Sequence, residues 1–474
     1  MSTVPPAIAD AYDPERFRAD GKRLVDALAD QLAAWQRGDG PVLPYRAPAD
    51  ARAAWALGDT GPTAARGDLV ADLARFTAAS TALANPRCMG HQVAPPLPGA
   101  ALAELASALV NNGMAVYDMG PAAVPIELAV IDWMCARLGL PAGATGVLTS
   151  GGSLGNLTAL LAMRQARAGF DAWRAGAQGG PPLAVVTSTD AHYAIARAVR
   201  VLGMGDAGVI AAPVDAHHRL TPEAVLRALA TAGDRHVLGV VCAASSTATG
   251  AFDPLDELAD LCAERGLWLH VDAAHGGGLA LSPRHAGKLR GIGRADSVVW
   301  DAHKLLVMPA LVTAVLFKRG GDAYAAFAQK ASYLFESGAP EDTWWDLGSR
   351  HFECTKRAMA VELWATLRAH GEGWFGAVVD RQMELAQALA AKVAAAPDFE
   401  LALPPECNIV CFRPRGDGID MRELRRRVIE DGRVYITGTE LAGSYWLRCT
   451  LMNPLTEPAD LDAMLEVVRA SCRA

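Results

Sequence analysis

The chain has 474 residues, of which 51% are hydrophobic and 20% charged, a composition typical of a globular protein of two or three domains. The formal net charge of −8 offers no basic surface for nucleic acid, and no apolar run reaches the roughly 18 residues of a membrane helix. The nine cysteines lack the spacing of a zinc or disulfide framework. We therefore expect reduced thiols, no metal site, and a cytoplasmic protein without a signal peptide.

The N-terminal part, residues 1–85, is expected to be a helical segment. Residues 14–37 carry apolar positions at helical spacing, with Asp13 as a candidate N-cap and Pro14 as a candidate first helical residue. Residues 38–66 are rich in Gly, Pro and Asp, and we expect them to form a connecting arm.

A large domain is expected over residues 86–368. After two helical stretches between residues 99 and 140, short β-rich runs alternate with helices. The expected strands are GVLTS (146–150), LAVVTST (183–189), GVIAAPV (208–214), HVLGVVCAAS (236–245), LWLHVDAA (267–274), SVVWDA (297–302) and ALVTAVLF (310–317). Such nearly continuous apolar runs are typical of strands with helices on both faces. The alternation predicts an α/β fold with a mostly parallel, doubly wound sheet, which binds ligands at the carboxyl ends of its strands.

Helical and β-rich stretches also alternate over residues 369–474, but they are fewer, and we expect them to form a separate, smaller α+β domain. A long helix is expected over residues 374–396, and shorter helices near residues 421–431 and at the C-terminus. The expected strands are FELAL (399–403), NIVCF (408–412), RVYIT (433–437) and YWLRCTL (445–451).

The first candidate binding motif along the chain is TSGGSLGN, residues 149–156, which follows an expected strand and begins an expected helix. Gly151 and Gly152 permit a tight turn, and Ser153 can cap the helix while its hydroxyl faces an anion. A Gly-Gly-Ser turn can also be only a helix start. It is neither a Walker loop nor a dinucleotide fingerprint, because GKS, GKT and GxGxxG are absent.

Three further polar residues follow expected strands. Asp272, in HVDAAHGGG, ends an apolar run, where a carboxylate requires a partner. Lys304, in SVVWDAHKLLVMP, ends the next such strand, and a lysine beside apolar surface can form a Schiff base with a carbonyl. His192, in TDAHYA, can stack on a flat ring. Each alone can be a turn, surface or helix-start residue.

Together these elements describe a pocket for one ligand. They supply an anion cradle, a carboxylate for a cationic ring nitrogen, a Schiff-base lysine and an imidazole to stack on a ring. Pyridoxal 5′-phosphate (PLP) requires this combination.

At this point a family resemblance is clear. The chain resembles the group II PLP-dependent amino-acid decarboxylases, which include the glutamate, cysteine sulfinate, 2,4-diaminobutyrate and aromatic L-amino-acid decarboxylases. The resemblance runs from about residue 14 to the C-terminus, and its sharpest pieces are TSGGSLGN, TDAH, HVDAAHGGG, DAHK, ASYLF and WLRCTLMNP. It implies the PLP fold-type I architecture and a homodimer with active sites at the interface.

The resemblance also implies roles for individual residues. Lys304 would carry the cofactor, Asp272 would pair with the ring nitrogen, and His192 and Ala274 would pack against the two faces of the ring. The further cofactor-binding residues implied are Gly152, Ser153, Thr247, Ser297, Asp301 and His303. The family often has Asn where this chain has Asp301. A carboxylate beside a phosphate would be repelled, so we expect Asp301 to act without touching the phosphate.

The resemblance implies decarboxylation of an L-amino acid to an amine and CO₂. Tyr333, in ASYLF, matches the tyrosine that protonates Cα in the family, although it could also be structural. Arg448 matches the residue that holds a substrate carboxylate in glutamate-decarboxylating relatives. His91 and Gln92 occur where aromatic-specific relatives carry aromatic rings, so a small polar or acidic substrate is expected.

The sequence leaves three alternative functions open. One is an aromatic-L-amino-acid decarboxylase or an aldehyde synthase, and another is a different fold-type I PLP enzyme, such as an aminotransferase or a lyase. A cofactor-free binding or scaffold protein is the third, against which Lys304, Asp272 and His192 together argue.

Overall fold

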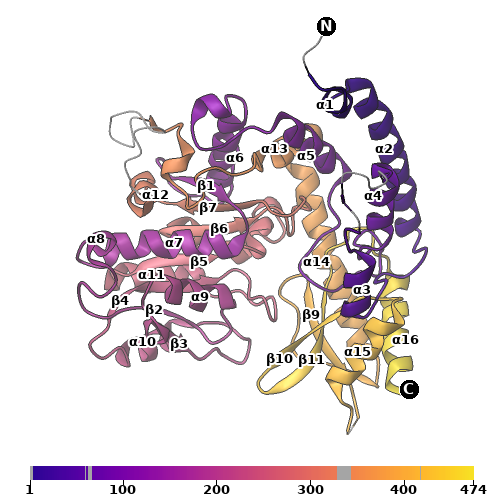
Figure 1. The fold of residues 1–474 in the computed structure, drawn as a ribbon. Helices are drawn as coiled ribbons and strands as arrows, with labels where there is room; N and C mark the ends of the chain where they lie inside the picture. The colour runs from indigo at the N-terminus through magenta and orange to yellow at the C-terminus, as the bar shows by residue number, and fades with distance from the viewer. Residues whose placement is uncertain (1–3, 59, 62–66, 328–342, 417, 474) are drawn as a thin grey trace.

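The computed structural model describes residues 4–58, 60–61, 67–327, 343–416 and 418–473. Within them the chain forms a seven-stranded sheet between helices, a smaller four-stranded sheet, and a group of N-terminal helices (Figure 1). None of the described helices has an apolar stretch long enough to cross a lipid bilayer.

All seven strands expected from the apolar runs are present in the large sheet. Their order across the sheet is β1-β7-β6-β5-β4-β2-β3. β7 is antiparallel to both of its neighbours, and the other neighbouring pairs are parallel. The strands are β1 (Thr145–Thr149), β2 (Leu183–Ser188), β3 (Val209–Ala212), β4 (His236–Ala243), β5 (Trp268–Asp272), β6 (Ser297–Asp301) and β7 (Thr313–Phe317). The prediction of a mostly parallel sheet is confirmed.

Helices cover both faces of this sheet because both faces of its strands are apolar. Val147 and Val299 pack in one buried cluster with α7 and α9, whereas their neighbours Leu148 and Val298 pack in a second cluster with α6, α10 and α11. Alternate residues of a strand point to opposite faces, which explains the continuous apolar runs. The helices of this part are α5 (Pro98–Val110), α6 (Ala123–Arg137), α7 (Gly152–Arg167), α8 (Ala172–Ala175), α9 (Tyr193–Val201), α10 (Pro222–Ala230), α11 (Leu255–Arg265), α12 (Gly320–Phe327) and α13 (Ala360–His370).

The N-terminal helices lie beside the C-terminal part of the chain (Figure 1). They are α1 (Pro6–Ala11), α2 (Pro14–Gln36), α3 (Pro48–Ala54) and α4 (Leu69–Ala78). As expected, Asp13 caps α2 by accepting from the Glu15 amide at 3.0 Å. The expected arm contains α3, and it docks onto the C-terminal part where the Val42 amide donates to the Gly432 carbonyl at 2.8 Å.

The four-stranded sheet is antiparallel throughout, in the order β10-β11-β9-β8. Its strands are β8 (Phe399–Leu401), β9 (Ile409–Pro414), β10 (Thr437–Leu441) and β11 (Ser444–Thr450), and its helices are α14 (Glu372–Ala395), α15 (Met421–Asp431) and α16 (Pro458–Arg473). The boundary expected between residues 368 and 369 falls within the last turn of α13.

The prediction of a strand at residues 433–437 is wrong, because only Thr437 of these residues belongs to a strand, β10. Tyr435 instead forms an isolated parallel bridge with Cys88. Its amide donates to the Arg87 carbonyl at 3.2 Å, and its carbonyl accepts from the Met89 amide at 2.9 Å. A distant segment thus takes the backbone groups that a local strand would have used.

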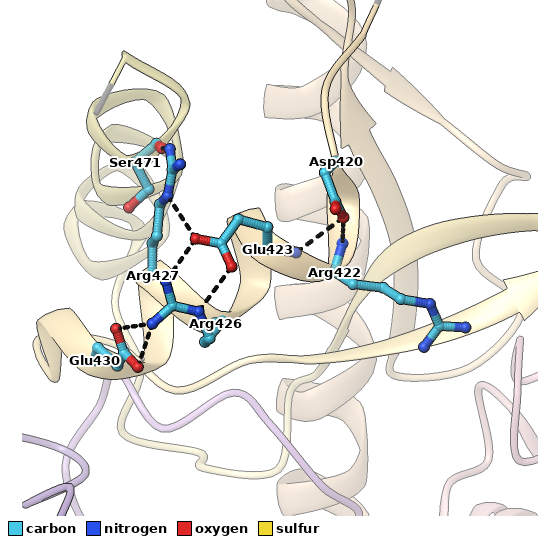
Figure 2. Close-up of polar contacts among 7 residues, drawn as sticks. All are labelled: Asp420, Arg422, Glu423, Arg426, Arg427, Glu430 and Ser471. Carbon is cyan, nitrogen blue, oxygen red and sulfur yellow. Dashed lines mark hydrogen bonds and ion pairs between the residues drawn. The ribbon is translucent and has the colours of Figure 1, made fainter.

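Charged side chains orient α15 at the surface (Figure 2). Asp420 caps the helix by accepting from the amides of Arg422 and Glu423, both at 3.0 Å. Glu423 accepts from Arg427 at 3.1 Å, and Arg427 also donates to the Ser471 carbonyl of α16 at 3.3 Å. Exposed ion pairs of this kind contribute little stability, so their effect is to fix how α15 and α16 lie together.

Candidate active site

A cavity of about 140 Å³ lies at the carboxyl ends of the parallel strands of the large sheet. The turns after β1, β2, β4, β5 and β6 line it, as expected for an open α/β sheet. The lining residues are Gly152, Ser153, Asn156, His192, Ser245, Thr247, Asp272, Ala274, His275, Asp301, His303 and Lys304. The structure therefore brings together every expected cofactor-binding residue except Ser297.

The N-terminus of α7 opens onto this cavity. Gly151 occupies the N-cap position with φ +96°, a conformation that favours glycine, and no side chain caps the helix. Ser153 therefore lies in the first turn and is not the cap that we expected. A Cβ built on Gly152 would lie 3.4 Å from both carboxylate oxygens of Asp301 and 3.5 Å from the Cβ of Ala274. The missing side chain leaves the first amides of α7 accessible to an anion.

Asp272 is the last residue of β5 and presents a fixed carboxylate. Its Oδ2 accepts from Asn156 Nδ2 at 3.1 Å, and its Oδ1 accepts from the Ala274 amide at 3.2 Å. Because both oxygens are held, the plane of the carboxylate is set by the protein.

Lys304 has an ionic partner of its own. Its Nζ lies 3.0 Å from Asp301 Oδ2, and Thr313 donates to Asp301 Oδ1 at 2.6 Å. The His303 ring lies against the backbone of Val312, with Nδ1 3.0 Å from its carbonyl. Asp301 thus contacts the lysine, and its expected lack of contact with the phosphate stays a prediction.

His192 is the N-cap residue of α9, where Nδ1 accepts from the Ala194 amide at 3.3 Å. Burial lowers the pKa of His192 below its ordinary value. The positive charge of Lys304 lowers it further, whereas the negative charges of Asp272 and Asp301 oppose the shift. The imidazole is therefore neutral at neutral pH.

The three residues expected at the substrate side are not among those that line the cavity, but one of them contacts its wall. Arg448, 6% exposed, donates to the carbonyl of Thr247 at 2.7 Å and to that of Ala248 at 3.2 Å. Burial lowers the pKa of His91, and the charge of Arg448 lowers it further. Gln92 has a buried Nε2 without a hydrogen-bond partner among the described residues.

One expected cofactor-binding residue lies away from the cavity. Ser297 begins β6, whereas Asp301 ends it, and the fully buried Ser297 hydroxyl bonds to Trp268 and His270. Four residues of strand span about 13 Å, which separates Ser297 from the cavity edge. Tyr333 lies outside the described residues.

Three lining residues were missed from the sequence, although each stands in a stretch that drew attention. Asn156 follows Gly152 by one helical turn and so faces the same side of α7. Ser245 follows β4, and His275 follows β5. His275 donates from Nε2 to Asn408 at 2.6 Å, and burial lowers its pKa to about 3, so it is a neutral wall residue. Helical spacing could have identified Asn156, but the sequence carried no signal for the other two.

The donor set fits PLP. The open N-terminus of α7 suits a phosphate, the fixed carboxylate of Asp272 suits a cationic ring nitrogen, and Lys304 suits a carbonyl carbon. The charge of Asp301 beside Gly152 is matched by Lys304 and Thr313, so it does not stand as an unpaired anion next to the phosphate position.

Comparisons with known proteins agree with this geometry. The pyridoxal-dependent decarboxylase conserved domain matches residues 85–415. The chain is 33% identical to L-2,4-diaminobutyrate decarboxylase of Rhizobium meliloti over 82% of this chain and 78% of that protein. It is 32% identical to cysteine sulfinic acid decarboxylase of Mus musculus over 75% of this chain and 76% of that protein. The crystal structure of mouse CSAD, 26% identical, superposes with a TM-score of 0.88 over 97% of this chain and 99% of that chain. The chain therefore belongs to the pyridoxal-dependent decarboxylase family and is a PLP-dependent amino-acid decarboxylase of fold-type I.

Proposed function

We propose that the enzyme converts a small acidic L-amino acid into the corresponding amine and CO₂. The observation that carries the choice of substrate is Arg448, a buried guanidinium beside the cavity wall. It forms no ion pair with any carboxylate of the described residues, and its hydrogen bonds there go to two backbone carbonyls. A buried cation without a counter-ion is costly, and a substrate carboxylate would compensate for it.

The cofactor would be held by the residues that line the cavity. Gly152 and Ser153 would bind the phosphate at the N-terminus of α7, and Asp272 would pair with the ring nitrogen. Lys304 would bind the carbonyl carbon, and Thr247 would contact the cofactor from the turn after β4. When bound, PLP supplies an electron sink for the electron pair left at Cα by the departing CO₂.

The chain's own residues then hold charges and protons in place. Asp301 orients Lys304, whose Nζ lies 3.0 Å from Asp301 Oδ2. His192 and Ala274 would lie on opposite faces of the ring. Because His192 is neutral, it can stack on a cationic ring without charge repulsion. Tyr333 would deliver the proton to Cα.

The relatives favour a polar substrate, and the choice among polar substrates rests on charge. Cysteine sulfinic acid decarboxylase acts on an acidic substrate, which would suit Arg448. A second candidate is 2,4-diaminobutyrate, because the Rhizobium meliloti decarboxylase of that name is 33% identical. Its side-chain ammonium would be repelled by Arg448. An aromatic side chain would leave the guanidinium without a counter-ion.

We also propose a cytoplasmic homodimer. No disulfide joins the nine cysteines, all of which belong to the described part of the chain. α2 buries none of its residues, although it carries Phe17, Val25 and Leu28, and α5 exposes Leu102 and Leu109. A second copy would cover these apolar side chains and place active sites at the interface. Sedimentation of the active enzyme tests this proposal.

Replacing Lys304 by Ala should abolish both CO₂ release and covalent retention of PLP. Borohydride reduction followed by peptide mass spectrometry should find the pyridoxyl group on Lys304 in the wild type and on no lysine of the variant. The control is Lys392→Ala, which removes an ion pair between α14 and Asp462 of α16, away from the residues that line the cavity. Turnover by Lys304→Ala at the wild-type rate would contradict the assignment.

The imidazole of His192 should titrate below 6.5 in the cofactor-free enzyme, because its burial opposes the charged form. NMR of ¹⁵N-labelled histidine across pH 4 to 8 measures the titration, and His192→Gln identifies the resonance. Titration at or above 6.5 would contradict the effect of burial, and titration above 7 would leave the ring mostly charged at neutral pH and unsuited to stacking on a cation.

Replacing Arg448 by Met should lower kcat/KM for cysteine sulfinate and aspartate by about 10- to 100-fold, because one charge-assisted interaction is lost. The rate with 2,4-diaminobutyrate should not fall. The matched control is Arg413→Met on the neighbouring strand β9, where the guanidinium pairs with Glu400. An equal loss on every substrate would make Arg448 structural, and a wild-type preference for 2,4-diaminobutyrate would establish the second candidate.

Replacing Tyr333 by Phe should lower amine formation by about 10² to 10⁴-fold, the usual contribution of a general acid. PLP should stay bound, and an aldehyde product should become detectable, because the electron-rich carbon would react with oxygen instead. Product analysis by mass spectrometry measures both. Unchanged amine yield without aldehyde would return Tyr333 to a structural role.

A further inference from the structure

Asp272 stands at the end of a chain of buried hydrogen bonds. Trp268 Nε1 lies 2.9 Å from Ser297 Oγ, and Ser297 Oγ lies 2.8 Å from His270 Nδ1. His270 Nε2 lies 2.7 Å from Asn156 Oδ1, and Asn156 Nδ2 lies 3.1 Å from Asp272 Oδ2. The four residues that precede Asp272 in this chain are at most 1% exposed. We call them the β5 chain.

The strand geometry explains why these groups meet. Trp268, His270 and Asp272 alternate along β5, so all three point to the face that α7 covers. Asn156 reaches them from α7. Ser297 reaches them from β6, where it pairs with His270 in the parallel register. Three elements therefore contribute to one line of contacts that begins in the core and ends at the cavity.

The groups at the two ends of the β5 chain determine which atom donates and which accepts in each of its hydrogen bonds. The indole N–H of Trp268 can only donate, so Ser297 Oγ accepts from it and gives its own hydrogen to His270 Nδ1. His270 then carries its hydrogen on Nε2 and donates to Asn156 Oδ1. The amide of Asn156 consequently turns its N–H toward Asp272. A carboxylate can only accept, so the last link agrees with the first.

The charge state of His270 matches this direction. Burial lowers the pKa of His270 to about 4, so the ring is neutral and offers one donor and one acceptor. A protonated ring would offer two donors and would leave Ser297 without an acceptor for its hydrogen. Each polar atom that takes part in the β5 chain thus has a partner in this arrangement of hydrogens.

We propose that the β5 chain positions Asp272 and holds it as an ionised hydrogen-bond acceptor, which sets the preference of the site for a protonated ring nitrogen. Trp268, Ser297, His270 and Asn156 are positioning residues, since they act only through Asp272. The inference rests on the proposed pairing of Asp272 with the ring nitrogen. It also gives Ser297 a role: its hydroxyl lies three hydrogen bonds before the carboxylate of Asp272.

Binding of two cofactors to the apoenzyme tests the proposal. 1-Deazapyridoxal 5′-phosphate keeps the phosphate, carbonyl and ring shape of PLP but has carbon in place of the ring nitrogen. The quantity measured is the ratio of the two dissociation constants, which cancels effects on general folding. The variants are Asp272→Asn, Asn156→Leu and Ser297→Ala. The control is Thr158→Val, because Thr158 is buried in the same helix and its hydroxyl has no hydrogen-bond partner among the described residues.

Wild type and Thr158→Val should favour PLP over the deaza compound. Asp272→Asn should reduce that preference by about 10- to 100-fold. Asn156→Leu should reduce it by about tenfold, the value of a hydrogen bond to a charged group, and Ser297→Ala, which acts through His270 and Asn156, by about two- to tenfold. If Asp272→Asn keeps the wild-type ratio, the ring-nitrogen role fails and the inference fails with it. If only Asp272→Asn changes the ratio, the ring-nitrogen role stands, but the proposal that the β5 chain positions Asp272 is wrong.

A second measurement uses the wild-type protein and therefore does not depend on whether a variant folds. ¹⁵N NMR of labelled histidine in the apoenzyme distinguishes the two neutral tautomers of His270. The proposal requires the hydrogen on Nε2 at neutral pH. A hydrogen on Nδ1, or a charged ring, would reverse or break the β5 chain and would overturn the proposal.

Discussion

A sheet that is buried on both faces has no room for charge along its strands, and this constraint organises the whole protein. Charged groups are therefore confined to the ends of the parallel strands, and the carboxyl ends meet at one edge. Asp272 and Asp301 are the last residues of β5 and β6, and Lys304 follows directly. The side chains that would bind the cofactor therefore converge from distant parts of the sequence without any long loop to position them.

Charges that enter the interior are stabilised in two ways. The lysines have carboxylate partners: Lys304 has Asp301, and Lys356 donates to Glu127 at 2.5 Å. Glu127 also accepts from the Leu148 amide of β1 at 2.9 Å, so this pair is tied to the large sheet. The buried arginines Arg164, Arg350 and Arg448 instead donate to backbone carbonyls. Arg448 differs from the other two because its carbonyl partner Thr247 lines the cavity, where a substrate that brings a negative charge would stabilise it.

The sequence predicted the elements whose signals are local and missed those that depend on distant partners. Apolar runs identified every strand of the large sheet, because burial on both faces leaves a continuous pattern. The strand expected at residues 433–437 failed because Tyr435 bonds to the segment around Cys88. Family resemblance identified residue types at the site, but it did not show which end of β6 faces the cavity, and so Ser297 was expected among the cofactor-binding residues. The contact between Asp301 and Lys304 could not be predicted from the sequence, which indicated only that Asp301 would not touch the phosphate.

The antiparallel strand β7 has a consequence for how the enzyme is made. Thr313 pairs with Thr149 on one side and with Asp301 on the other, so β7 alone joins the strand before the α7 turn to the strand before Lys304. These contacts link residues far apart in the chain, and such pairings form slowly because a long loop must close first. During synthesis on the ribosome, β1 and β6 cannot become parts of one sheet until β7 has emerged. A nascent chain that ends before Thr313 would hold the α7 turn and Lys304 on strands that are not yet joined, so only the contacts of α7 with β5 would connect the two sides of the site.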